Sequence, residues 1–419
     1  MNLYLGIDFG TSGARAIVID QEGIIQAEAQ YSFPTNETRF NTLLIWKKAL
    51  FSLIEQIPQE VRQEIRAIAI DGTSSTVLLC DPTGLAITEP ILYNDARGVV
   101  VMEPLNAIAP PNHTVLSATS SLAKLLWFLQ NTKGPIDNSY FLHQADWLAF
   151  LLHRQLGISD YHNALKLGYD VENLSYPQWL ETLPCPIQLP HVVPPGTPIA
   201  EVSSDTANQL GLRKNCWVCA GTTDSIAAFI ASGAQSPGEA VTSLGSTLVL
   251  KLLSRTRVED ARYGIYSHRL GDLWLTGGAS NTGGAVLRHF FSDSQLEQLS
   301  CQIDAATESP LDYYPLLNVG DRFPINDPHL SPRLEPQPGN PVDFLHGLLE
   351  SLARIEARGY QLLQQMGATP LIGVYTSGGG AKNPTWAVIR GRHLTVPILP
   401  PQHTAAAYGT ALLAMRSYN

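Results

Sequence analysis

The chain has 419 residues, of which 44% are hydrophobic and 15% charged, a composition typical of ordered globular proteins and not of disordered ones. This length exceeds what one hydrophobic core usually serves, so we expect two domains. The formal net charge of −10, without a long cluster of Lys and Arg, disfavours nucleic acid as a partner.

Membrane insertion and secretion are also disfavoured. Charged residues, Gly or Pro interrupt every apolar run before it reaches the roughly 18 residues of a membrane span. The opening MNLYLGIDFG is typical of a core strand and lacks the features of a signal peptide. Five scattered cysteines indicate a reduced, cytoplasmic protein. Cys216 and Cys219 form a C-x-x-C without a second pair for zinc, which favours a buried strand.

The first half of the chain opens with a predicted antiparallel meander of three strands over 3–8, 16–19 and 24–33. Alternating and helical spacings of apolar residues predict the later elements. In chain order these are a helix over 43–57, strands over 66–71 and 77–80, helices over 122–130 and 144–153, an irregular proline-rich stretch over 175–200, a strand over 216–220 and a helix over 226–231.

The second half repeats this theme. Two strands within 240–253 flank a polar turn, and 264–277 reads as a hairpin that turns at Gly271-Asp272. A long amphipathic helix over 342–366, a strand over 373–376, a helix from about Pro384 and a closing helix over 405–416 follow. The two halves therefore suggest a duplication of architecture, although their sequences do not align as a repeat.

The strongest functional segment is GIDFGTSGAR, which places Asp8 at a strand end and a glycine and hydroxyl turn directly after it. The amides of this turn and the hydroxyls of Thr11 and Ser12 can donate to phosphoryl oxygens, with Gly13 allowing close approach. Asp8 can hold a magnesium ion directly or through water. The alternative is an ordinary hairpin with an exposed Asp.

Two further segments fit the same chemistry. Gly245, Ser246 and Thr247 form a second glycine and hydroxyl turn between strands, as expected if two hairpins hold one polyphosphate. Asp224 follows an apolar strand and begins a helical pattern, so it is either a helix cap or a general base that accepts a proton from a hydroxyl.

A glycine cluster follows the strand over 373–376, in the sequence GGGAKNP. Without side chains at Gly379 and Gly380 the backbone can lie against a nucleoside, and Asn383 can offer amide contacts to it. A flexible linker is the alternative. The common nucleotide loops G-x-x-x-x-G-K-[ST] and G-x-G-x-x-G are both missing, so phosphates must be held differently.

Taken together, these motifs resemble those of the FGGY carbohydrate kinases along almost the whole chain. The resembling segments are GIDFGTSGARAIVID, SSLAKLLWFL, GTTDSIAAFIASG, SLGSTLVL and TSGGGAKNPTW. The resemblance implies an α/β fold of two ribonuclease-H-like lobes, as in the actin and sugar-kinase superfamily, with a nucleotide cleft between them. It implies a sugar-binding lobe over 1–228 that carries the catalytic Asp, an ATP-binding lobe over 229–401, and a C-terminal helix within 402–419 that packs back on the first lobe.

Carried over residue by residue, the resemblance implies catalytic roles for Asp8, Thr11 and Asp224, and magnesium at Asp8. The implied sugar contacts are Ser74, Asp95, Arg97 and Asp224, where a surface ion pair between Asp95 and Arg97 is the alternative. The implied ATP contacts are Thr11, Ser12, Gly13, Gly245, Ser246, Thr247, Gly379, Gly380 and Asn383.

The segments DGTSST and YNDAR resemble those of the compact ketopentose kinases of this family more closely than those of glycerol kinases. We therefore expect MgATP-dependent phosphorylation of D-ribulose first and D-xylulose second, by a monomer or homodimer whose partners are the sugar and ATP. Two other readings stay open. One is an actin-like ATPase switch without a sugar acceptor, and the other is a sugar-binding regulator with degraded catalysis, against which the presence of Asp8, Thr11 and Asp224 argues.

Overall fold

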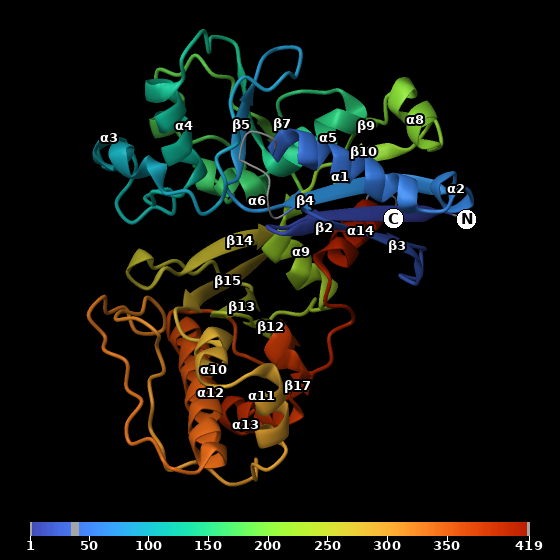
Figure 1. Ribbon diagram of the computed structural model, residues 1–419. Helices are drawn as coiled ribbons and strands as arrows, with labels where there is room; N and C mark the ends of the chain where they lie inside the picture. The colour runs from blue at the N-terminus through green and yellow to red at the C-terminus, as the bar shows by residue number, and fades with distance from the viewer. Residues whose placement is uncertain (1, 35–41, 417–419) are drawn as a thin grey trace. The chain divides into compact units, whose positions relative to one another are not determined.

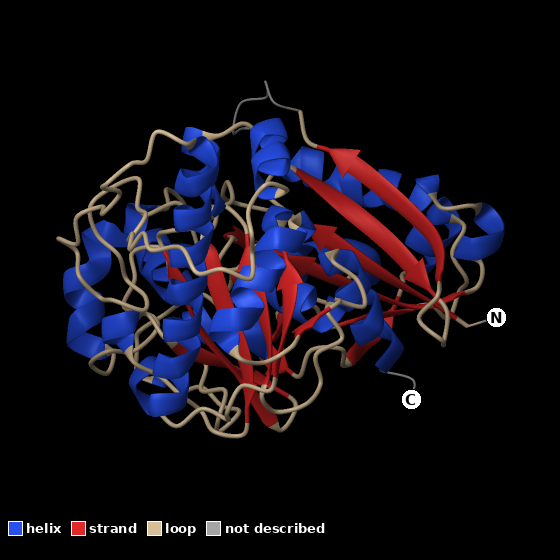
Figure 2. Ribbon diagram, turned by 90° about the horizontal axis from the view of Figure 1, so that it is seen from below, coloured by secondary structure: helices blue, strands red, loops and turns tan. Residues whose placement is uncertain are grey.

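A computed structural model describes residues 2–34 and 42–416. The chain forms two compact units, Met1–Ala231 with Ala405–Asn419 (unit 1) and Ser232–Thr404 (unit 2), whose elements are labelled in Figure 1. Each unit has its own sheet and its own buried clusters, and Figure 2 distinguishes the strands from the helices that cover them. The prediction of an α/β protein with two sheet-containing lobes is confirmed.

The main sheet of unit 1 has the order β3-β2-β1-β4-β10-β9, with β11 also paired to β4, so seven strands form it within the described residues. The strands β1–β3 form the predicted antiparallel meander, whereas β4 runs parallel to β1. Parallel strands bring their carboxyl ends to one edge, where ligand sites of such sheets commonly lie. The strands are β1 (Leu3–Phe9), β2 (Gly13–Ile19), β3 (Ile25–Ser32), β4 (Ile65–Gly72), β9 (Pro198–Glu201), β10 (Trp217–Cys219) and β11 (Thr222–Thr223).

Helices cover both faces of this sheet. One face is buried in an apolar cluster against α1 and α5, where Leu5 and Ile7 of β1 meet Leu50 and Leu148. The opposite face, to which Tyr4 of β1 belongs, packs against the last helix of the chain. The helices of unit 1 are α1 (Thr42–Gln56), α2 (Gln59–Arg62), α3 (Met102–Ile108), α4 (Ser121–Asn131), α5 (Gln144–His153), α6 (Tyr161–Ala164), α7 (Gln178–Glu181), α8 (Ser204–Leu210), α9 (Asp224–Ala231) and α14 (Ala406–Arg416), with 3-10 turns η2 (Arg97–Val101) and η3 (Leu165–Leu167).

The helix α14 returns to unit 1 after the chain has passed through unit 2, and it is drawn in red beside β1 and α9 in Figure 1. Gly6 of β1 permits this approach, because a Cβ there would lie 2.1 Å from the carbonyl oxygen of Ala407. The same close packing occurs at Gly409, whose Cβ would lie 1.9 Å from the Ala227 carbonyl oxygen. Glycine therefore lets backbone meet backbone at both contacts.

The remaining strands of unit 1 form two small sheets, β5 (Val77–Cys80) with β6 (Tyr140–His143), and β7 (Ile158–Asp160) with β8 (His191–Val193). The prediction of an irregular stretch over 175–200 is wrong for α7, β8 and β9. Pro198 opens β9, which is the edge strand, so its missing N–H leaves no ladder bond unmade. The thiols of Cys216 and Cys219 are fully buried, as predicted for a core strand.

The sheet of unit 2 has the order β14-β15-β13-β12-β16-β17, which matches the meander and parallel pattern of unit 1. Its strands are β12 (Glu239–Leu244), β13 (Leu248–Ser254), β14 (Tyr266–Leu270), β15 (Leu273–Ser280), β16 (Gly373–Ser377) and β17 (Ile398–Leu399). Its helices are α10 (Gly284–Phe290), α11 (Asp293–Ser300), α12 (Pro341–Gln365) and α13 (Pro384–Leu394), with 3-10 turns η4 (Ala261–Tyr263) and η5 (Gly379–Lys382).

The long helix α12 lines the core of unit 2 and carries a buried ion pair. Glu356 accepts from the Arg390 guanidinium of α13 at 2.6 and 2.7 Å, and both side chains are 1% exposed. The hydroxyl of Thr242 in β12 also donates to Glu356, at 2.5 Å. Among the described residues, every helix is too short or too polar to traverse a bilayer.

Candidate active site

Acidic side chains gather at the carboxyl ends of the parallel strands of unit 1. Asp8 in β1 lies directly beside Asp71 in β4, and Thr222 in β11 lies beside Asp71 on the other side. Asp224 follows β11 by one residue and begins α9. The parallel pairing thus places three carboxyl groups at one edge of the sheet.

The carboxyls of Asp8 and Asp71 share a hydrogen bond. Burial raises the pKa of Asp71 well above its usual range, and the charges of Asp8 and Asp224 raise it further. Burial also raises the pKa of Asp8, while the hydrogen bond from Asp71 and the charge of Arg15 lower it. The protonated form is therefore favoured more strongly at Asp71 than at Asp8.

The two oxygens of Asp71 have different surroundings. Oδ2 accepts a short hydrogen bond from the hydroxyl of Thr410 in α14. Oδ1 is buried and accepts no hydrogen bond from any described donor. Because a buried carboxylate oxygen without a donor is costly, these surroundings favour the protonated form of Asp71.

Asp224 is half-buried and sits in the first turn of α9, where the helix dipole favours a negative charge. Its Oδ1 accepts from the amide of the next residue, Ser225, at 2.6 Å. From Ile226 onward α9 is apolar, and Ile226, Phe229 and Ile230 are buried. The helix is thus fixed while its first residue stays accessible.

The first predicted phosphate turn lies between β1 and β2. Thr11 and Ser12 are exposed, and the amide of Gly10 donates to the carbonyl oxygen of Gly13 at 3.0 Å. The amide of Phe33 donates to the Ser12 carbonyl oxygen, also at 3.0 Å, which ties the turn to the end of β3. The hydroxyls of Thr11 and Ser12 are therefore presented by an anchored turn close to Asp8.

The predicted sugar residues lie on the loops that follow β4 and β5. Ser74 is half-buried, three residues after Asp71. Asp95 and Arg97 form an ion pair of 2.6 Å with side chains 20% and 34% exposed, as in the alternative interpretation. The Arg97 guanidinium also lies 4.8 Å from the centre of the Trp127 ring in α4.

A fully buried lysine holds these two loops together. The ammonium of Lys124 in α4 donates to the carbonyl oxygens of Ser75 and Leu92, both at 2.7 Å, and of Tyr93 at 3.4 Å. Burial lowers the pKa of Lys124 to about 7, against the raising effect of Asp95. Lys124 therefore joins the loop of Ser74 to the loop of Asp95.

In unit 2 the second predicted turn and the glycine cluster are brought together. Gly378 has φ = 82°, and a Cβ there would lie 2.7 Å from the Leu244 carbonyl oxygen and 3.0 Å from the Gly245 nitrogen. Only glycine satisfies both this conformation and this contact. The turn at Gly245 also meets the start of α10, since the Gly284 amide donates to its carbonyl oxygen at 2.9 Å.

Side chains of α10 and of the loop before α13 form hydrogen bonds near this turn. Arg288 of α10 donates to the Ser246 hydroxyl at 2.9 Å. Asn383 caps α13, because its Oδ1 accepts from the Trp386 amide at 3.0 Å, and its amide group donates to Ser300 at 2.8 Å. Gly379 and Gly380 form the turn η5 directly before it. The three predicted nucleotide elements of unit 2 thus lie beside the end of β12.

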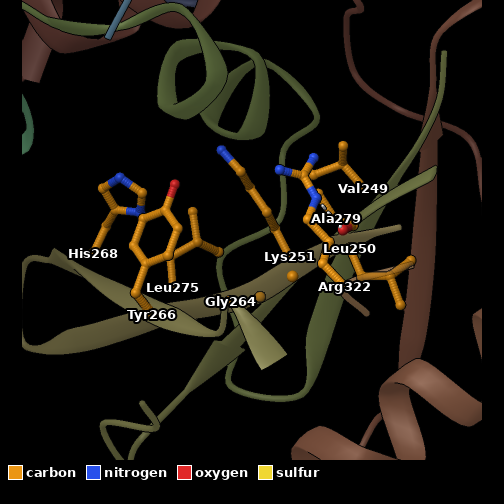
Figure 3. A pocket seen from close by; sticks show the side chains of 11 residues that line it. Val249, Leu250, Lys251, Gly264, Tyr266, His268, Leu275, Ala279 and Arg322 are labelled. Atoms are coloured by element: carbon orange, nitrogen blue, oxygen red, sulfur yellow. Dashed lines mark hydrogen bonds between the residues drawn. The ribbon is translucent and has the colours of Figure 1, made fainter. Parts of the chain in front are cut away.

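A pocket of about 210 Å³ lies on the same unit, over β13, β14 and β15 (Figure 3). It begins at Val249, two residues after the turn, and none of the predicted site residues lines it. Figure 3 shows the side chains of Lys251 and Arg322 on the same side of the sheet, with Tyr266 and His268 further along. Among the described lining residues, no side chain is acidic.

Comparison with known proteins gives the family. A family model described as the N-terminal domain of the FGGY family of carbohydrate kinases matches residues 3–231, and the model of its C-terminal domain matches 240–418. The chain belongs to the FGGY family of carbohydrate kinases. Membership confirms the enzyme class predicted from the motifs, a carbohydrate kinase, and disfavours the reading as a filament or chaperone ATPase.

Individual relatives of this FGGY kinase act on different acceptors. A xylulose kinase from Bacillus subtilis is 25% identical over 99% of this chain and 88% of its own length. A glycerol kinase from Koribacter versatilis is 23% identical over 98% and 88%. Among solved structures, a protein from Brucella ovis described as a xyloylose kinase superposes with a TM-score of 0.85 at 22% identity, covering 99% of this chain and 90% of that one. Proteins related at identities this low share a fold, but their similarity does not determine which sugar this chain phosphorylates.

Several residues at these sites were missed by sequence reasoning. Asp71 ends an apolar strand directly before Gly72 and Thr73, the same signal that singled out Asp8 before Gly10 and Thr11. Lys124 lies in the segment SSLAKLLWFL, but sequence reasoning assigned it no role. Thr410 and Arg288 had no local signal, because their partners lie 339 and 42 residues away in the sequence.

Proposed function

We propose that this FGGY kinase transfers the γ-phosphoryl group of MgATP to a terminal hydroxyl of a ketopentose, with D-ribulose preferred and D-xylulose as the alternative. Unit 1 binds the sugar and unit 2 the nucleotide. The observation that carries the proposal is the gathering of the Asp8, Asp71 and Asp224 carboxyls at the carboxyl ends of the parallel strands, where burial raises the pKa of Asp71 well above its usual range. Two carboxylates can then take separate roles.

Asp224 is the general base. It accepts the proton of the attacking hydroxyl, and its position at a helix N-terminus stabilises its ionised form until the proton arrives. Ser74, Asp95 and Arg97 orient the sugar through hydrogen bonds from loops that Lys124 holds in place. Positioning of this kind supplies much of the rate enhancement in phosphoryl transfer.

The residues around Asp8 suit a magnesium ion, which prefers carboxylate, hydroxyl and water oxygens. Asp8 is half-buried, and the hydrogen bond from Asp71 and the charge of Arg15 lower its pKa against the larger raising effect of burial. Thr11, Ser12 and Gly13, with Gly245, Ser246 and Thr247 of unit 2, donate to the phosphate oxygens. Bound magnesium would neutralise phosphoryl charge, and Gly379, Gly380 and Asn383 hold the adenosine.

The test is ADP release with MgATP against a panel of D-ribulose, D-xylulose, L-ribulose, aldopentoses, polyols and glycerol. We expect a large rise with one ketopentose and loss of about 10³-fold or more in kcat for Asp224→Ala, since the base and its charge are both removed. Equal ADP release with and without every sugar would contradict the proposal and favour an ATPase switch. A preference for glycerol would contradict the ketopentose assignment alone.

A further inference from the structure

The short helix α6 holds the two-residue strand β11, which precedes Asp224. Nδ1 of His162 lies 2.7 Å from the hydroxyl of Thr222. The side-chain amide of Asn163 donates to the main-chain carbonyl oxygen of the same Thr222 at 3.2 Å. All three residues are at least 98% buried, so α6 engages both the side chain and the backbone of Thr222.

Asp160 organises this contact. It caps α6 through its Oδ1, which accepts from the amides of His162 at 2.8 Å and Asn163 at 3.1 Å. Its Oδ2 accepts from Nδ2 of Asn163 at 2.6 Å, and the same Nδ2 reaches Thr222 with its other hydrogen. The amide of Asn163 is therefore held between Asp160 and β11, and it cannot rotate without breaking a buried hydrogen bond.

β11 has support on two sides. On one side it pairs with β4, where Thr222 lies beside Asp71 and Thr223 beside Gly72. On the other side it meets α6. A two-residue strand makes few ladder bonds of its own. The contacts with α6 therefore contribute much to fixing the backbone direction from β11 into α9.

We infer that His162 and Asn163, oriented by Asp160, are positioning residues that set the placement of Asp224 through Thr222. The inference rests on the proposed role of Asp224 as the base. None of the three touches a reacting atom. Their effect is to hold Asp224 within the narrow range of positions from which it can take the proton, because a displacement of about 1 Å can cost about 100-fold in rate.

A matched pair at Thr222 tests this directly. Thr222→Val keeps the shape of the side chain and removes the hydroxyl that meets His162, whereas Thr222→Ser keeps the hydroxyl. With saturating MgATP and D-ribulose, or D-xylulose if that sugar is the acceptor, we expect the single-turnover rate to fall about 10- to 100-fold for the Val variant. The Ser variant should stay within about threefold, and the KM of both substrates should change little in either.

Asn163→Ala provides the second arm, because it removes both amide contacts, and Ser203→Ala provides the control. Ser203 caps α8 in the same unit through the Thr206 amide, so its loss costs a cap without touching β11. We expect Asn163→Ala to slow the single-turnover rate as Thr222→Val does, and Ser203→Ala to leave it unchanged. Thermal melting of all variants separates lost stability from lost rate.

The decisive measurement is the double variant Thr222→Val with Asp224→Ala. If Thr222 acts through Asp224, the residual rate of Asp224→Ala should not fall further when Thr222→Val is added. A further fall, an unchanged rate in Thr222→Val alone, or an equal fall in Thr222→Ser and Ser203→Ala would overturn the inference. Wild-type turnover by Asp224→Ala would instead remove the base role proposed above, and with it this inference.

Discussion

Asp8 and Asp71 lie side by side on parallel strands, and burial raises the pKa of both carboxyls, that of Asp71 more strongly. We predict that Asp71→Asn keeps most of the activity, since the amide also donates to Asp8 and still accepts from Thr410. Asp8→Asn should lower kcat by about 100-fold or more, because it removes the charge proposed to hold magnesium. Steady-state kinetics over a magnesium titration check this, and equal losses in both variants would contradict it.

The buried ammonium of Lys124 joins the loops that carry the proposed sugar contacts. We predict that Lys124→Met raises KM for the sugar about 10-fold or more, because its three carbonyl partners lose their donor and both loops can shift. KM for ATP should stay nearly unchanged. Lys133→Met, at an exposed position in the same unit, is the control. An unaltered KM for the sugar in Lys124→Met would show that the loops hold without it.

The approach of Gly378 to the turn at Gly245 predicts a selective effect on the nucleotide. Gly378→Ala places a Cβ against the Leu244 carbonyl oxygen and should raise KM for ATP about 10-fold, with a smaller change for the sugar. Gly367→Ala is the matched control, since Gly367 also has a positive φ, of 100°, but open space around its Cβ. Equal effects of the two substitutions on KM for ATP would mean that backbone strain alone is responsible.

The ion pair of Arg390 and Glu356 predicts a large effect on stability. Arg390→Met leaves Glu356 buried without its cation and should lower the free energy of unfolding by about 3–5 kcal/mol. Arg262→Met breaks a 2.6 Å pair with Asp260 in which Arg262 is 74% exposed, and should cost much less, because solvent screens an exposed ion pair. Urea unfolding of both variants measures the difference, and comparable losses would refute the assignment of Arg390 to the core.

Burial lowers the pKa of His153 to about 4, below its ordinary value of 6.5, and its Nδ1 accepts from the Gln155 amide. As the pH falls from 6.5 to 4 the unfolded chain binds a proton that the folded chain does not. The contribution of neutral His153 to the free energy of unfolding is therefore fully present above pH 6.5. It is lost as the pH falls toward 4, at up to about 1.4 kcal/mol per pH unit. We predict that His153→Gln flattens this slope in urea unfolding, whereas the exposed His191→Gln leaves it as in wild type.

Much of this architecture was predictable because it depends on local patterns. The turn between β1 and β2, the start of α9 at Asp224 and the glycine cluster before α13 each follow from apolar strands that end in polar or glycine residues. Asp71 carried the same signal and could have been found. Its raised pKa could not, since it depends on burial and on the register with Asp8, both of which arise from contacts distant in the sequence.

Features that depend on distant contacts escaped prediction. The proline-rich stretch contains the edge strand β9, which forms only because β10 offers it a free edge. The strand β11 is two residues long, too short to give any periodic signal, and its partners on α6 lie about 60 residues earlier in the chain. Sequence reasoning found Asp224 but not the residues that hold it.

Because α14 returns to unit 1, the sequence of unit 2 is an insertion within the sequence of unit 1. Ala231 and Ala405, the two points where the chain leaves and re-enters unit 1, are buried in one cluster, and on the unit 2 side the Gln402 amide donates to the Ser232 carbonyl oxygen at 2.9 Å. The coding segment for unit 2 therefore behaves as a cassette with adjoining ends. A chimera that takes Ser232–Thr404 from another family member would therefore need only two junctions, at neighbouring points of the chain.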